Sequence, residues 1–187
     1  NNISIDTRTL KKDSLFIALK GENFNGNKFI EKAFASGASA VLCSNKAYKN
    51  KNNAIYVPSV RDALLKISSN IASDFQGKKI LITGSNGKTS TTCILSKSLP
   101  KCSSTIRNFN NEIGLPISIM SAKKDNRYIV LEAGAAKKGD IEYLSKLVKP
   151  DIGIITNIGY SHLEKLLNLE GVFKVKSELI KNIRKGG

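Results

Sequence analysis

The sequence predicts an α/β protein: a small N-terminal α/β domain followed by an incomplete domain with a doubly wound, mainly parallel sheet. Short apolar runs bounded by polar turns alternate with helical patterns along the 187 residues, as parallel sheets require. This alternation becomes regular after the polar, glycine-ended segment 74–77. We therefore expect one domain over residues 1–76 and a second over residues 77–187.

In the first domain the hydrophobic pattern predicts strands near residues 3–5, 15–19, 40–43 and 55–57. Phe29, Ile30, Ala33 and Phe34 share one face of a predicted helix, and Gly37 is well placed to end it. Ser59 and Asp62 form a capping box for a second helix that runs to about residue 75.

In the second domain we expect strands at residues 80–82, 103–106, 128–131 and 152–155, with helices at 89–99, from about 113, at 141–148 and from about 169. Ligands of such sheets bind at the carboxyl ends of the strands. Four polar features fall at these ends: a glycine loop, an asparagine-rich turn at 108–111, Glu132, and Asn157 with His162. They predict a single site.

The glycine loop reads Thr-Gly-Ser-Asn-Gly-Lys-Thr-Ser over residues 83–90. A strand, a glycine loop with Lys-Thr and a helix are typical of P-loop nucleotide enzymes. Ile82 stands where the usual form has a glycine, so a tight turn with a chance Gly-Lys-Thr is the alternative. The flanking strand and helix favour phosphate binding, by Gly84, Ser85, Asn86, Gly87, Lys88, Thr89 and Ser90.

Glu132 ends a buried strand near this loop and is expected to bind Mg²⁺ with the nucleotide phosphates, although a solvated edge carboxylate is the alternative. His162 is the only histidine, and structural and functional roles both stay open for it. One histidine and dispersed cysteines cannot form a zinc site. A Gly-x-Ser-x-Gly elbow is also lacking, which argues against a serine hydrolase.

Composition narrows the possible partners. The net charge of +15 comes from scattered lysines and arginines, and aromatic residues make up 6%. A lysine-rich solvated surface is therefore favoured over nucleic-acid binding. Three cysteines without a close pair favour a reducing compartment. Without a leader or an apolar run of about 18 residues, we expect a cytoplasmic protein with no membrane insertion.

Five ordered motifs resemble the Mur ligases, the ATP-dependent amide-forming enzymes of peptidoglycan precursor synthesis, and are most similar to the MurF type. The motifs are residues 83–90; 108–116; 132–135 with 139–141; 156–159 with 162–164; and 6–8 with 16–21. The resemblance implies that D-Ala-D-Ala is joined to UDP-MurNAc-tripeptide through an acyl phosphate. Alternatives are the MurE type, a folylpolyglutamate synthase, or a non-catalytic nucleotide- or polyanion-binding module.

The resemblance also implies roles for single residues. The catalytic set would be Lys88, Glu132, His162 and Lys176. One Mg²⁺ would be bound by Thr89 and Glu132, and a second by His162 with Lys176 carbamylated by CO₂, with Lys174 as the rival lysine. Substrate would contact Thr7, Arg8, Asn108, Asn110 and Asn111. Family members continue into a third domain, so we expect a monomeric fragment that is inactive alone.

Overall fold

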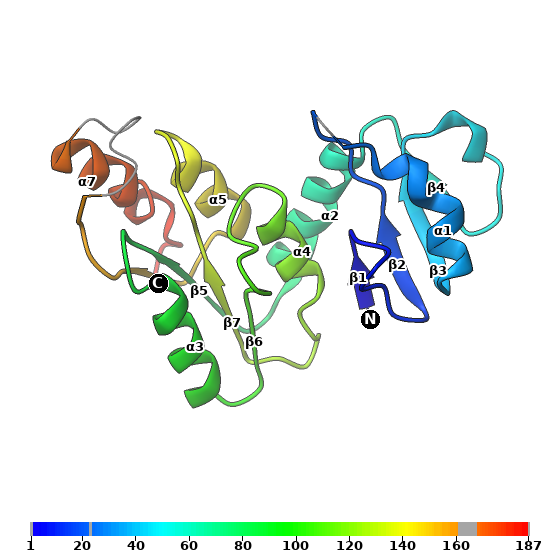
Figure 1. Cartoon of the computed structure of the whole chain (residues 1–187). Coiled ribbons are helices and arrows are strands. Elements are labelled where there is room, and N and C mark those ends of the chain that lie inside the picture. Colours follow the sequence, from blue (N-terminus) through cyan, green and yellow to red (C-terminus); the bar gives the residue numbers. More distant parts are fainter. Residues whose placement is uncertain (1, 23, 161–167, 187) are drawn as a thin grey trace. The chain divides into compact units, whose positions relative to one another are not determined.

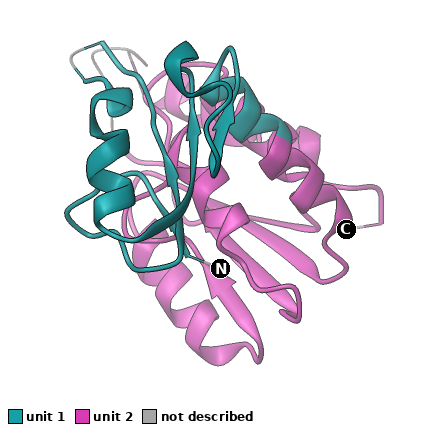
Figure 2. Cartoon of the chain, turned by 90° about the vertical axis from the view of Figure 1, so that its right-hand side faces the viewer, with its two compact units in different colours: residues 1–66 teal, residues 67–187 magenta. Residues whose placement is uncertain are grey.

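The computed structural model describes residues 2–22, 24–160 and 168–186. The chain divides into two compact units, Asn1–Lys66 and Ile67–Gly187, coloured separately in Figure 2. The division falls inside helix α2 (Val60–Asp74). Each unit contains its own four-stranded parallel sheet. No helix in the described part of the chain is long and apolar enough to cross a membrane.

The first unit has the strand order β1-β2-β3-β4, and every neighbouring pair is parallel. Its core joins Phe16 and Val41 of the central strands to Ile30 and Ala33, which are spaced to share one helical face. Gly37, at φ +92°, follows this helix and donates to the carbonyl of Phe34 at 2.9 Å. The bounds are β1 Asn2–Ser4, β2 Ser14–Ile17, α1 Ile30–Ala35, β3 Ala38–Cys43 and β4 Ala54–Tyr56, with short 3-10 turns at Gly26–Phe29 and Lys46–Tyr48.

The second unit has the order β6-β7-β5-β8, also parallel throughout. Strand and helix alternate along the chain, as predicted, and the elements can be followed in Figure 1. The bounds are β5 Lys78–Thr83, α3 Lys88–Ser98, β6 Cys102–Ser104, α4 Gly114–Met120, β7 Tyr128–Glu132, α5 Asp140–Val148, β8 Ile152–Ile155 and α7 Leu169–Ser177, followed by a 3-10 turn at Ile180–Asn182.

Helices cover both faces of this second sheet. Successive residues of a strand point to opposite faces. Ile82 and Val130 accordingly pack with Leu95 of α3, whereas Leu81 and Leu131 belong to a larger core with residues of α4, α5 and α7. The predicted doubly wound arrangement is therefore confirmed, and its carboxyl edge is the expected place for a site.

At the opposite, amino-terminal edge of the sheet, the buried side chains of Lys79 and Asp151 connect neighbouring elements. The backbone N–H of Lys79 donates to Asp151 Oδ2 at 2.8 Å, and Arg184 Nη1 lies 3.3 Å from Asp151 Oδ1. Lys79 Nζ donates to the carbonyl of Ala72 near the end of α2, at 2.6 Å. Burial lowers the pKa of Lys79, and the Asp151 carboxylate opposes that shift. These bonds join the starts of β5 and β8 to α2.

Candidate active site

The glycine loop connects β5 to α3 in a backbone conformation that needs its glycines. Gly84 has φ +147° and Gly87 has φ +79°, in the region that side chains disfavour. A Cβ at Gly84 would also lie 1.9 Å from Thr156 Oγ1. Gly87 is the N-cap residue of α3, so the loop ends where unpaired backbone N–H groups and the helix dipole attract anions.

A second segment, residues 156–159, braces this loop. The backbone N–H of Asn86 donates to Asn157 Oδ1 at 2.9 Å, and that of Ser85 donates to the Asn157 carbonyl at 3.2 Å. Ser85 Oγ donates to the Gly159 carbonyl at 2.7 Å and accepts from the Gly159 N–H at 3.0 Å. Thr156 Oγ1 donates to the Asn86 carbonyl at 2.5 Å. The loop is thus held from the end of β8.

Lys88 opens α3 and lies over the loop. Its Nζ donates to the carbonyls of Gly84 at 2.7 Å and Ser85 at 3.3 Å. These carbonyls keep the ammonium group above the loop, beside the backbone N–H groups at the helix start. An anionic ligand would therefore meet the fixed dipoles and one full positive charge at the same place.

Glu132, the last residue of β7, bonds to residues that follow β5 and β6. The side chain is only 3% exposed, although it ends β7 at the carboxyl edge of the sheet. Its Oε2 accepts from Thr89 Oγ1 and its Oε1 from Asn110 Nδ2, both at 2.8 Å. The backbone N–H of Glu132 donates to Thr105 Oγ1 at 2.7 Å. The structure brings Thr89, Asn110 and Glu132 into one hydrogen-bonded group.

The other two asparagines of the predicted substrate set, Asn111 and Asn108, form hydrogen bonds with the backbone of their own turn. Asn111 Oδ1 accepts from the backbone N–H groups of Ile113 at 3.1 Å and Gly114 at 2.8 Å, so it fixes the start of α4 while still lining the pocket described next. Asn108 is exposed, and its carbonyl accepts from the N–H of Asn110 at 2.8 Å. Asn108 shapes the turn that presents Asn110.

A pocket of about 700 Å³ opens beside the loop, and Lys88, Asn110, Asp140 and Lys176 are among its lining residues. Lys176 is only 1% exposed. Burial and the positive charge of Lys88 lower the pKa of Lys176 to about 8, and Asp140 opposes that shift. Its ammonium group makes no hydrogen bond or ion pair to any residue within the described ranges. Lys176 is therefore a buried amine at the pocket wall.

The rival lysine, Lys174, lies on the other side of α7. Its Nζ forms an ion pair with Glu170 at 2.7 Å, one turn earlier in the helix, and its side chain is 67% exposed. The packing thus distinguishes two lysines that the sequence alone left as alternatives. Lys176 faces the pocket, and Lys174 faces solvent.

Glu178 belongs to the site's support, and the sequence did not reveal its role. Its Oε1 accepts from the N–H of Gly139 at 2.9 Å and its Oε2 from the N–H of Glu142 at 3.0 Å. A carboxylate in this position satisfies the free N–H groups at the start of α5. Glu178 follows Lys176 by two residues, so the same contact fixes the end of α7 against α5.

His162 lies outside the described residues, so its predicted role stays a prediction. Elsewhere in the described ranges, no group of three or more His, Cys, Asp or Glu side chains could hold a metal ion. A divalent cation at Thr89 and Glu132 would therefore have one carboxylate, one hydroxyl and oxygens of the ligand or water. Mg²⁺ in nucleotide sites uses this kind of donor set.

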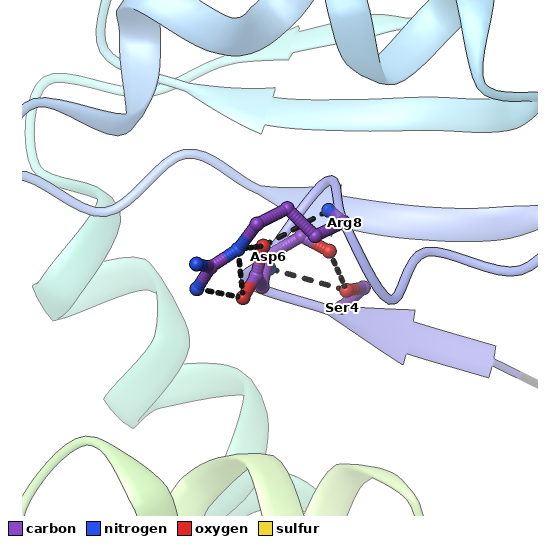
Figure 3. Close-up of polar contacts among 3 residues, drawn as sticks. All are labelled: Ser4, Asp6 and Arg8. Carbon is purple, nitrogen blue, oxygen red and sulfur yellow. Dashed lines mark hydrogen bonds and ion pairs between the residues drawn. The ribbon is translucent and has the colours of Figure 1, made fainter.

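Thr7 and Arg8, the remaining predicted substrate residues, lie in the first unit. Figure 3 shows the Arg8 guanidinium against Asp6: Nε donates to Oδ1 at 2.9 Å, and Nη2 donates to Oδ2 at 2.6 Å. Ser4 Oγ donates to the carbonyl of Asp6 at 2.8 Å and closes the turn. The Arg8 side chain is 81% exposed and is oriented by this contact.

Comparison with known families gives matches over nearly the whole chain. Residues 82–187 match the Mur ligase middle domain, and residues 1–74 match the model described as Mur ligase family, catalytic domain. The chain belongs to the Mur ligase family. The resemblance seen in the five motifs is thereby confirmed for this Mur ligase chain.

Similar proteins carry the name UDP-N-acetylmuramoyl-tripeptide–D-alanyl-D-alanine ligase. One from Buchnera aphidicola (subspecies Baizongia pistaciae) is 40% identical over 100% of this chain, and one from Bacillus subtilis is 37% identical, also over 100%. This chain covers 42% of each relative. It therefore spans about two fifths of their length.

Solved structures of MurF proteins are similar in fold to this chain. MurF from Acinetobacter baumannii has a TM-score of 0.85 and 31% identity, and covers 100% of this chain, which matches 42% of that protein. MurF ligase from Thermotoga maritima in complex with ADP has a TM-score of 0.81 and 33% identity, with 98% of this chain and 43% of that protein covered. The predicted α/β fold is thus shared with known MurF structures.

Proposed function

We propose that this Mur ligase chain contains the nucleotide site of an ATP-dependent ligase that joins D-Ala-D-Ala to UDP-MurNAc-tripeptide. The observation that carries the proposal is the group of Thr89, Asn110 and Glu132 at the phosphate loop, beside a pocket with the buried amine of Lys176. The names of its relatives support the substrates. The proposed setting is a cytoplasmic monomer that binds no nucleic acid.

In this proposal the phosphate loop binds ATP. Residues 84–90 supply backbone N–H groups and the start of α3, and Lys88 contributes its ammonium group to the terminal phosphates. The contacts from Asn157 and Gly159 hold the loop from the end of β8. A loop held in this way loses less entropy on binding than an unsupported one.

Thr89 and Glu132 are suited to bind the first Mg²⁺. Both offer oxygen donors, and Asn110 fixes the orientation of the carboxylate through its amide. Bound Mg²⁺ would neutralise charge on the transferring phosphate. His162 and Lys176 are proposed for a second Mg²⁺, with the Lys176 amine converted to a carbamate. That conversion supplies an anionic oxygen ligand in place of a cation.

Lys176 fits this modification because carbamylation requires the neutral amine. The amine nitrogen attacks the carbon of CO₂, an N–C bond forms, and the nitrogen releases a proton to solvent. With a pKa of about 8, about a quarter of the Lys176 side chains are neutral at pH 7.5, against about one in a thousand for an ordinary lysine.

We expect a ¹³C carbamate NMR signal with labelled bicarbonate in the wild type and none in Lys176→Met.

Lys176→Met should also change stability in a pH-dependent way. The lowered pKa means that, between about pH 8 and 10.5, the unfolded chain binds more protons than the folded one, so stability rises with pH there. Below pH 8 the folded state carries the full cost of the buried charge. We expect Lys176→Met to raise stability at pH 7 by roughly 1–3 kcal/mol, and the gain to shrink towards pH 10.

Thermal unfolding in CO₂-free buffer measures this difference. Lys174→Met is the matched control, because that lysine is exposed and paired with Glu170. A gain that stays constant from pH 7 to 10, or a loss of stability at pH 7, would contradict the burial of a lysine charge at this position.

The acyl substrate enters the reaction through its carboxylate. A carboxylate oxygen attacks the γ-phosphorus of ATP, ADP leaves, and the amine of D-Ala-D-Ala then displaces phosphate to form the amide. Asn108, Asn110 and Asn111 are proposed to contact the substrate in the second unit. Thr7 and Arg8 are proposed to bind the UDP portion in the first unit, where Asp6 already orients Arg8.

Phosphate release tests the function. The protein that contains this chain, at the full length of its relatives, should release phosphate from ATP only when both UDP-MurNAc-tripeptide and D-Ala-D-Ala are present. Phosphate release that does not depend on both substrates would contradict the proposal. A substrate panel separates the alternatives: a free diamino acid in place of D-Ala-D-Ala tests for the MurE type, and a folate with glutamate in place of both substrates tests for a folylpolyglutamate synthase.

A further inference from the structure

Lys137 and Lys138 lie on the loop between β7 and α5 and line the same pocket as Lys88 and Lys176. Both side chains are exposed. Neither ammonium group forms a hydrogen bond or an ion pair with another residue in the portion of the chain that the structure describes. Two adjacent positive charges are therefore available to a ligand in this pocket.

The backbone beneath these lysines is held in place. The N–H groups of Ala136 and Lys137 donate to Asp140 Oδ2 at 2.8 and 2.9 Å. The N–H of Gly139 donates to Glu178 Oε1 at 2.9 Å, and Gly139 itself turns the chain at φ +89°. The lysine stems therefore extend from a fixed loop, which limits the entropy lost when they bind a ligand.

With Lys176 unmodified, the charges around the pocket do not balance. Four lysines then line it, against the carboxylates of Glu112 and Asp140, and the Asp140 carboxylate accepts two backbone hydrogen bonds of its own loop. Lys88 lies over the phosphate loop, where it serves a nucleotide. Lys137 and Lys138 extend from a different strand end, so they are suited to a second anionic group.

We propose that Lys137 and Lys138 bind a carboxylate of the peptide portion of the acyl substrate. The inference rests on the proposed function and names part of its substrate site. Acyl phosphate formation brings a carboxylate to roughly 3–3.5 Å from the γ-phosphate, and the two anions repel each other. Positive side chains on the substrate side of the pocket offset this repulsion and hold the peptide in place.

The test measures binding by calorimetry with the protein that contains this chain, at the full length of its relatives. The variants are Lys137→Ala/Lys138→Ala, the charge-retaining Lys137→Arg/Lys138→Arg, and Lys123→Ala/Lys124→Ala as a matched control. Lys123 and Lys124 form another exposed pair in the same unit and do not line the pocket. The ligands are UDP-MurNAc-tripeptide, UDP-MurNAc without the peptide, and Mg²⁺–ADP.

We expect the alanine pair at 137 and 138 to weaken binding of UDP-MurNAc-tripeptide by about tenfold. Binding of UDP-MurNAc and of Mg²⁺–ADP should change less than twofold, the arginine pair should restore affinity, and the control pair should have no effect. The difference should shrink at high salt, because exposed charges are screened.

Unchanged affinity for the tripeptide substrate would overturn the inference, and so would an equal loss for UDP-MurNAc, which would assign the lysines to the diphosphate or to the lactyl carboxylate of the sugar. In both cases the wild type would still bind and release phosphate, so the proposed function would survive. A wild type that binds neither UDP compound would overturn both proposals together.

Discussion

Lys88→Ala is expected to weaken binding of Mg²⁺–ADP by roughly 10- to 100-fold. The ammonium group belongs to the first residue of α3 and lies over the phosphate loop, 2.7 Å from the Gly84 carbonyl oxygen. Hydrogen bonds to charged groups contribute about 1.5–3 kcal/mol, which corresponds to this range of affinity. Isothermal titration of Mg²⁺–ADP measures the loss directly.

Lys97→Ala is the matched control for this experiment. Lys97 is an exposed lysine in the last turn of the same helix, so its replacement removes the same charge away from the loop. We expect its ADP affinity to stay within twofold of the wild type. Equal affinities for Lys88→Ala and the wild type would contradict phosphate binding by Lys88 and favour the alternative of a tight turn with a chance Gly-Lys-Thr.

Gly84→Ala should unfold the phosphate loop or prevent the second unit from folding at normal temperature. An alanine Cβ would lie 1.9 Å from Thr156 Oγ1, and the backbone has φ +147°, which alanine rarely adopts. Overpacking and backbone strain each cost about 1–3 kcal/mol, so we expect a loss of about 3 kcal/mol or more. Chemical denaturation measures the free energy of unfolding, and titration with Mg²⁺–ADP measures whether the loop still binds the nucleotide.

Two further variants separate the causes of this loss. Gly159→Ala is the tolerant counterpart, because its Cβ would have no neighbour closer than 3.7 Å. Thr156→Ala added to Gly84→Ala removes the clashing hydroxyl and should recover part of the stability, but not the part due to φ. Full stability in Gly84→Ala alone would show that the loop backbone differs from the one described above.

Local patterns were enough to predict the order of strands and helices and much of the site. Ile80, Leu81 and Ile82 form an apolar run before the glycine loop, and this run is the buried centre of β5. The pairing of Glu132 with Thr89 could be predicted because Glu132 ends β7 and Thr89 follows the neighbouring parallel strand β5. In each case a short stretch of sequence determines the local structure, and parallel topology brings the ends together.

The remaining contacts join segments that are far apart in sequence. Thr156 and Asn157 brace a loop some seventy positions earlier, and Glu178 caps the start of α5 across thirty-six positions. No local pattern marks such partners. Lys174 and Lys176 show the same limit, since only the packing of α7 shows which of them is buried.

The transfer of carboxylate oxygen to phosphate tests the central claim most directly. UDP-MurNAc-tripeptide labelled with ¹⁸O in the reacting carboxylate is incubated with ATP, D-Ala-D-Ala and the full-length protein that contains this chain. If Glu132, Thr89 and Lys176 serve carboxylate activation, the attacking oxygen stays with the phosphate, and each phosphate released carries one ¹⁸O atom. Phosphate without ¹⁸O would mean that water attacks ATP, and would contradict the acyl phosphate and the role of this site.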